Sequence, residues 1–435
     1  MQRMPAALVI PGAAAWLLAA GLGVSSCGGG AEPPPGQAAA GAGEQPAPAQ
    51  GGNPLDDYVE KAGTYLASTQ AEDGSWAYFH SHKPDFTDPE SHTNVFGTVI
   101  TLMNLTHTGS EASAHFQRGV DFVRARMTEG HVWSIYEPGQ FSEDSWFEPD
   151  ADTTAVALTL LAGRQPLKPA ELKKVRALYD KHRTPEGLYL TYFDGFHGSR
   201  GFVPDRNVPS LGVNLNVLGF FGKHELPRAT LLQSLRAATE ADKYWQQTPF
   251  YRSLPMLAYL ASNAVENGAP EAGELARRFL ADFAKGTGAE GEFASRLHTA
   301  DLAAYVKARA HACLLDRSPC RDLDGSVFQL ARRRKADGSW DAAPFYEYDV
   351  NQAALEAFLE RREFAVRRKR GGFAYDVEKA LAAPGTTHYY DGSPAETTSF
   401  ALKAIVFYRE LLSRRDEFML QTEPSPSPSA APAGN

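Results

Sequence analysis

Cysteine is scarce in this sequence: the 435 residues include three, at positions 27, 313 and 320. That number is too small for a disulfide scaffold or a cysteine-rich zinc module. Basic residues are outnumbered, 43 against 52 acidic ones, which gives a net charge of −9. Because no basic stripe is present, nucleic-acid binding is not expected. Beyond the N-terminal segment no apolar run reaches the roughly 18 residues of a membrane-spanning helix, so we expect no transmembrane helix there.

What the chain does contain is 43% hydrophobic and 22% charged residues. These proportions are ordinary for a globular protein, and the length supplies ample material for a large core. The length also corresponds to two or three domains, or to one large helical toroid.

Residues 1–26 have the pattern of an export signal, with Arg3 ahead of an apolar stretch over residues 6–24. Small residues then precede Cys27. This resembles the lipobox of bacterial lipoproteins, which implies lipidation of Cys27 and anchoring in the bacterial cell envelope, facing the periplasm or at the cell surface. A plain secretory signal with a chance cysteine is the alternative. The pattern does not say which membrane holds the anchor.

Two low-complexity segments flank the main part of the chain. Residues 27–53 are rich in Gly, Ala, Pro and Gln, and residues 421–435 repeat Pro-Ser. Such segments bury too little apolar surface to fold, so we expect a disordered tether and a disordered tail. Residues 54–420 are then the folded domain.

A repeated unit fills this domain: an amphipathic helix, a Gly-aromatic turn, a loop and a more apolar helix. The turn is clearest at Asp73-Gly74-Ser75-Trp76 and Asp337-Gly338-Ser339-Trp340. The apolar helices are expected to begin near Val95, Thr153, Gly212, Tyr251, Thr299, Val350 and Thr397. A period of about 50 residues is typical of a repeat array. We therefore predict an all-α fold, an (α/α)6 or (α/α)7 toroid, with an open solenoid as the alternative.

The Gln-x-x-Asp-Gly-Ser-Trp turn resembles the QW repeats of squalene cyclases. The last repeat, from Gly371-Gly372-Phe373 to Leu402, is similar to the terminal repeat of the prenyltransferase and squalene-oxidase repeat family. The resemblance implies the α/α toroid of terpenoid cyclases and protein prenyltransferases. It does not by itself imply an activity, because one fold hosts many functions.

The segment Asp150-Ala151-Asp152-Thr153-Thr154-Ala155 resembles the acid motif of class II terpene cyclases, which implies that Asp152 donates a proton and that Asp150 is its neighbour. Protonating an alkene needs a strong carboxylic acid in a pocket with little water. Aromatic side chains would stabilise the resulting carbocation. For an isoprenoid ligand the predicted substrate-binding residues are Trp76, Trp146, Phe147, Asp205, Tyr346, Asp349 and Tyr389.

The same segment also has internal copies, in which Asp205 precedes Asn207 and Asp349 precedes Asn351. A recurring Asp or Asn before an apolar helix is typical of an N-cap, which accepts hydrogen bonds from the first N–H groups of the helix. On that hypothesis Asp152 is a structural cap, and the protein is a non-catalytic binding or scaffold module of the envelope.

A third hypothesis follows from the toroid itself. Its inner helices run the same way, so their first turns meet at one rim, and that rim is acidic. The carboxylates expected there belong to Glu148, Asp150, Asp152, Asp205, Glu347, Asp349 and Glu396. Two carboxylates on opposite sides of a groove suit an inverting glycan hydrolase, and a lyase is a related possibility.

We expect neither a metal nor a cofactor. The zinc of protein prenyltransferases is held by Asp, Cys and His, and no Cys here follows an Asp by two residues at the start of an apolar helix. Cys313 and Cys320 could pair in an oxidising compartment or stay as buried thiols. The sequence does not set the oligomeric state.

Overall fold

The computed structural model describes residues 53–137, 146–202, 207–287, 294–349 and 388–422, except residues 54, 84, 198–200, 241–247, 252 and 296. The predicted signal peptide, Cys27 and nearly all of the predicted tether and tail lie outside these residues. The helix predicted to begin near Val350 lies outside them as well.

Helices of two kinds alternate along the described chain. The amphipathic ones are α1 (Asp56–Thr69), α3 (Ala114–Ala125), α5 (Pro169–Lys181), α7 (Ala229–Glu240), α9 (Ala272–Thr287) and α12 (Leu323–Arg332). The apolar ones are α2 (Val95–Leu105), α4 (Ala151–Leu161), α6 (Leu211–Lys223), α8 (Leu254–Glu266), α11 (Thr299–Leu315) and α15 (Pro394–Thr422). The apolar helices thus begin within three residues of the predicted positions that the structure describes.

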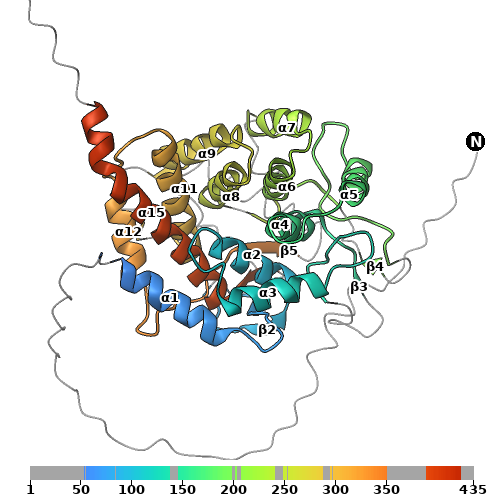
Figure 1. The fold of residues 1–435 in the computed structure, drawn as a ribbon, viewed down its shortest axis with the longest axis horizontal. Helices are drawn as coiled ribbons and strands as arrows, with labels where there is room; N and C mark the ends of the chain where they lie inside the picture. Colours follow the sequence, from blue (N-terminus) through green and yellow to red (C-terminus); the bar gives the residue numbers. More distant parts are fainter. Residues whose placement is uncertain are drawn as a thin grey trace, which may run out of the picture. The chain divides into compact units, whose positions relative to one another are not determined.

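Burial separates an inner ring from an outer ring. Every residue of α2 and of α4 is buried, whereas α1 buries only Ala62 and Leu66. A helix that is apolar on all sides belongs inside, and an amphipathic one covers it. In Figure 1 the apolar helices accordingly surround a centre, with the amphipathic helices outside them.

The inner ring is closed. Each inner helix packs on the next, from α2 through α4, α6, α8 and α11 to α15, and α15 packs back on α2 and on α1. The fold is therefore an α/α toroid, as predicted, with six inner helices among the described residues. Closure between the first and last helices excludes the open solenoid.

The Gly-Ser-Trp turn joins the two rings by the same pair of hydrogen bonds each time it occurs. The backbone N–H of Trp340 donates to Thr398 Oγ1 on α15 at 3.1 Å, and its indole donates to the Leu330 carbonyl on α12 at 2.8 Å. Trp76 makes the equivalent bonds to Thr98 on α2 and Leu66 on α1. Trp133, which follows Gly130-His131-Val132, makes the same pair of bonds to Thr154 on α4 and Val123 on α3. Each tryptophan therefore satisfies its polar groups while its ring fills the space between an outer and an inner helix.

The described chain also contains strands, which were not predicted, and four of them form one sheet. They are β1 (Ala77–Ser81), β2 (Glu90–Thr93), β5 (Tyr346–Asp349) and β6 (His388–Gly392), in an antiparallel sheet of order β2-β1-β6-β5. A second, smaller pair joins β3 (Trp146–Phe147) to β4 (Gly201–Phe202). The sheet of four strands brings the loops after the first and last tryptophan turns together.

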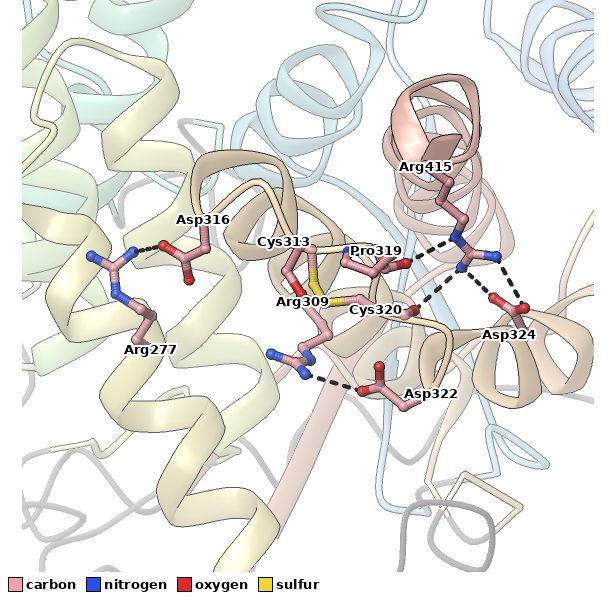
Figure 2. Close-up of a disulfide and its surroundings, with 10 residues drawn as sticks. Arg277, Arg309, Cys313, Asp316, Pro319, Cys320, Asp322, Asp324 and Arg415 are labelled. Atoms are coloured by element: carbon pink, nitrogen blue, oxygen red, sulfur yellow. Dashed lines mark hydrogen bonds and ion pairs between the residues drawn. A yellow bond between two sulfur atoms is a disulfide. The ribbon is translucent and has the colours of Figure 1, made fainter. Parts of the chain in front are cut away.

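Cys313 and Cys320 form a disulfide at the end of α11 (Figure 2). Arg415 on α15 donates to the carbonyls of Pro319 and Cys320 and to the carboxylate of Asp324. The disulfide loop is thereby fastened to α12 and α15. In the part of the chain described here, no helix combines the length and hydropathy that crossing a membrane requires.

Candidate functional site

Asp150 is the N-cap of α4. Its Oδ1 accepts a hydrogen bond from the backbone N–H of Thr153 at 2.6 Å, which is the bond that N-cap side chains provide. The capping hypothesis therefore holds for Asp150, and its assignment to Asp152 is wrong. The helix begins at Ala151, so Asp152 already lies within its first turn.

The Asp152 carboxylate instead joins three elements of the toroid. Its Oδ1 accepts a hydrogen bond from Asn216 Nδ2 on α6 at 2.8 Å, and its Oδ2 accepts one from the hydroxyl of Tyr251, just before α8. The residue is buried. Burial raises the pKa of Asp152 to about 6, against the opposing effect of the two hydrogen bonds. Asp152 is thus a buried acid held by side chains, and none of the described hydrogen bonds uses it as a cap.

A close approach of two elements positions Tyr251. A Cβ atom at Gly212 would lie 2.0 Å from the Tyr251 ring, so only glycine lets this ring rest on the first turn of α6. Tyr346 packs edge-on against the same ring, with centroids 5.5 Å apart. The Tyr251 hydroxyl is therefore aimed at Asp152 by packing on two sides.

Asp150 and Asp152 titrate as a pair. Burial, together with the charge of Asp152, raises the pKa of Asp150 to about 8. The Oδ2 atom of Asp150 is buried and has no hydrogen-bond partner among the described residues. Since two carboxylates this close resist a double negative charge, the pair retains a proton near neutral pH.

Aromatic rings surround this pair. Phe250 stacks on Tyr346 with centroids 5.0 Å apart, and Phe345 lies 5.6 Å from Tyr251. Tyr192 is buried as well: burial raises the pKa of its hydroxyl, and the charges of Asp150 and Asp152 raise it further. Ring faces next to a buried acid can stabilise a cation formed there.

A small pocket lies farther along the same helices. It is lined by residues of α2, α4, α6 and α8, among them Val156, Asn216, Tyr259 and Asn263. Its volume is about 20 Å³, enough for a water molecule or two. Asn216 both lines this pocket and bonds Asp152, so it connects the two. A ligand larger than water needs these lining side chains to move.

A second buried cluster of charges lies at the far end of α8. Glu266 pairs with Lys307 on α11 and, at 3.1 Å, with Lys403 on α15. Burial on its own would raise the pKa of Glu266, but the two lysines hold it below its usual value. Burial lowers the pKa of Lys307 to about 7. This cluster ties three inner helices together.

The structure places the remaining predicted site residues as follows. Trp76 lies in the core, and its indole donates to the Leu66 carbonyl at 2.8 Å. Phe147 packs against Tyr136, and Tyr346 borders the acid pair as described. Asp205 and the side chains of Trp146, Asp349 and Tyr389 lie outside the described residues.

Among the acidic residues predicted at the rim, Glu148 accepts hydrogen bonds from the backbone N–H groups of Phe196 and His197. Its carboxylate therefore stabilises the loop that contains these two residues. Glu396 is buried in the first turn of α15. Within the described ranges, no three His, Cys, Asp or Glu side chains converge in a way that could hold a metal ion.

Asn216 was not predicted as a site residue, and the strands were not predicted. Asn216 lies in the apolar run of α6 two residues after Asn214, and polar residues in a buried helix were the local sign that these side chains have partners. The partner of Asn216 is 64 residues away.

No protein-family model matches the chain, and no curated protein matches it. Solved structures do match. Type II terpene cyclase MstE from Scytonema has a TM-score of 0.53 at 17% identity, with 82% of this chain and 99% of that chain covered. A variant of MstE in complex with geranylgeranyl dihydroxybenzoate (substrate) has a TM-score of 0.53 at 15% identity, covering 82% and 98%. A protein from Actinoplanes has a TM-score of 0.51 at 16% identity, covering 82% and 99%.

At these identities the likeness concerns the fold. The chain shares the α/α toroid fold of these structures over nearly their whole length. Function has to be argued from the site.

Proposed function

We propose that this protein is a terpene-cyclase-like enzyme that starts its reaction by protonating an isoprenoid, with Asp152 as the acid. One observation carries the proposal: the Asp152 carboxyl is buried, is not used as a helix cap, and is held by Asn216 and Tyr251. A buried acid with a raised pKa and two aligned donors is typical of a general acid. The fold shared with MstE supports the same class of reaction.

In the proposed step the protonated Asp152 transfers its proton to an alkene carbon, and a carbocation forms on the neighbouring carbon. The two donors, Tyr251 and Asn216, then stabilise the carboxylate that remains. Because these donors favour the ionised form, they make Asp152 a stronger acid than burial alone would allow. The rings of Tyr251, Tyr346 and Phe250 border the place where the cation forms.

The other two hypotheses have less support. The glycan hydrolase needs rim carboxylates available to substrate, but Glu148 and Asp150 are engaged by backbone N–H groups. The scaffold hypothesis rested on Asp152 as a cap, and Asp150 has that role.

We propose that the protein is located in the bacterial cell envelope, anchored by a lipid on Cys27. The support is the N-terminal pattern of the sequence and the Cys313–Cys320 disulfide, a bond that persists in oxidising compartments. Membrane fractionation of the full chain and of a Cys27→Ala variant tests this. The proposal expects the variant to leave the membrane fraction, and an unchanged distribution overturns it.

The activity is tested with geranylgeranyl dihydroxybenzoate, the substrate bound by MstE. We expect the wild type to cyclise it and Asp152→Asn to lose at least about 100-fold in rate, since general acids contribute that much or more. The matched control is Asp301→Asn, which alters another buried aspartate in the first turn of an inner helix, there bonded by Ser253. Equal rates for wild type and Asp152→Asn, or equal losses in both variants, would overturn the assignment.

A further inference from the structure

The four-stranded sheet holds a second group of ionisable side chains, which lies near the pair Asp150 and Asp152. In the register of β1, β6 and β5, Asp391 lies opposite His80 on one side and Tyr346 on the other. Directly opposed residues of an antiparallel sheet share a face. His80, Asp391 and Tyr346 therefore project from the same face, and Tyr346 on that face contacts Tyr251.

Asp391 is fully buried, with one oxygen bonded and one not. Its Oδ1 lies 2.8 Å from His80 Nδ1. Its Oδ2 has no hydrogen-bond partner in the described part of the chain. Burial raises the pKa of Asp391, and the hydrogen bond and charge of His80 oppose this. A carboxylate with one oxygen unsolvated and unpaired is a stronger base than one in water.

Glu396 adds to the same group. It is buried, and neither of its carboxyl oxygens has a partner among the described side chains and backbone groups. Burial, then the charge of Asp391, raises the pKa of Glu396 well above its usual value. Burial thus favours the neutral form of Glu396 with no hydrogen bond opposing it, whereas the hydrogen bond of His80 supports the charged form of Asp391.

The Asp150–Asp152 pair and Asp391 act electrostatically on the same two tyrosines, Tyr192 and Tyr346. After burial, the charges of Asp150, Asp152 and Asp391 all raise the pKa of Tyr192 and of Tyr346. Asp152 comes from α4 on one side, and Asp391 comes from β6 on another. Tyr346 lies opposite Asp391 in the sheet and contacts Tyr251, which is bonded to Asp152, so it connects the two acidic groups.

We propose that Asp391 is the base that ends the reaction, and that His80 positions it and carries the proton away. This rests on the proposed function. In the step, a C–H bond next to the cationic carbon breaks, its electron pair forms the product alkene, and the proton goes to Asp391 Oδ2. The proton given by Asp152 at the start is balanced by the proton taken at the end, so the substrate is isomerised.

A row of side chains leads from Asp391 to the surface. The exposed fraction of the side chain rises along it, from 0% at Asp391 to 15% at His80, 24% at His92 and 73% at Glu90. The rings of His80 and His92 lie 5.9 Å apart, and His92 Nε2 lies 3.8 Å from Glu90 Oε2. Imidazoles suit this task because they gain and lose protons near neutral pH.

The test compares the products that wild type and Asp391→Asn form from geranylgeranyl dihydroxybenzoate. We expect the variant to consume the probe at most a few-fold more slowly, because Asp152 is intact. Its products shift to alcohols, from capture of the cation by water, or to other alkene isomers. The matched control is Asp194→Asn, which alters another Asp–His pair. Asp194 Oδ1 lies 2.7 Å from Nε2 of His182, the residue that follows the C-terminal end of α5. An unchanged product mixture in Asp391→Asn overturns the inference.

His80→Gln keeps the inference testable if Asp391→Asn does not fold. The glutamine amide can still donate to Asp391 but cannot pass a proton on. We expect an unchanged first turnover, unchanged products and a slower steady-state rate, a pattern that general destabilisation does not produce. A steady-state rate equal to that of the wild type overturns the role of His80. A wild type that leaves the probe intact overturns the proposed function itself, whereas an active wild type with insensitive variants overturns only this inference.

Discussion

The side-chain amide of Asn216 donates a hydrogen bond to Asp152 Oδ1 at 2.8 Å, while the Tyr251 hydroxyl donates to the other oxygen. Both donors favour the ionised carboxylate, and so both hold the pKa of Asp152 below the value that burial alone would give. The acid is therefore tuned by side chains of α6 and of the segment before α8.

The pH dependence of the reaction follows from this arrangement. Asp152 must be protonated to act, so the rate should fall as pH rises through its pKa of about 6. Tyr251→Phe removes a donor to the carboxylate, so the pKa rises and the fall moves to higher pH. A pH–rate profile of both proteins measures the shift. A shift of the variant to lower pH would contradict the assignment.

Asp150→Asn should make the stability of the protein less sensitive to pH. Asparagine is an equally good N-cap, so the cap is kept. Asp150 has a pKa of about 8 in the folded chain against a reference of 3.8, so its contribution is complete below pH 4 and is lost as pH rises toward 8. Relative to wild type, the variant should gain at least about 1 kcal/mol in free energy of unfolding between pH 4 and pH 8.

Urea unfolding at the two pH values measures this difference. The measurement at pH 4 serves as the control, since both side chains are neutral there in the folded protein. A difference that stays constant, or one that favours the wild type as pH rises, would show that Asp150 is not buried as described.

Thr154→Val tests the bond that fixes the second tryptophan turn. Thr154 Oγ1 accepts the backbone N–H of Trp133 at 3.0 Å, and both residues are buried. Valine keeps the shape but leaves that N–H unpaired, which costs about 1–3 kcal/mol. Thr154→Ser keeps the hydroxyl and should lose less stability in urea unfolding. Equal losses would mean that this hydrogen bond contributes little.

Local signals predicted the repeat well and the site only in part. The Gly-Ser-Trp turn and the apolar helix after it are short, contiguous patterns, so Trp76 and Trp340 marked their repeats correctly. Which of Asp150 and Asp152 caps α4 depends on where the helix begins, and a shift of two residues exchanges their roles.

The sheet could not be predicted in the same way, because its strands have four or five residues and β1 pairs with β6 from the other end of the domain. His80 and Asp391 are 311 residues apart. Neither lies in a motif that names the other, and the closure of the toroid is what brings them together.

Glu266→Gln should be strongly destabilising. It leaves Lys307 and Lys403 buried without their shared carboxylate, and breaking a buried ion pair in this way costs about 3–5 kcal/mol. Chemical denaturation measures the loss. The double variant Glu266→Gln/Lys307→Met removes a buried cation as well and should recover part of the stability. A single variant as stable as the wild type would refute the burial of this cluster.

The central claim is that the reaction begins with a proton from a buried carboxyl group, and cyclisation in D₂O tests it most directly. Acidic O–H groups exchange with solvent, so the account predicts one deuterium in each product molecule, at the carbon that receives the proton, and a rate at least about 100-fold lower with Asp152→Asn. A cyclised product without deuterium, or deuterated product formed at the wild-type rate by Asp152→Asn, would contradict it.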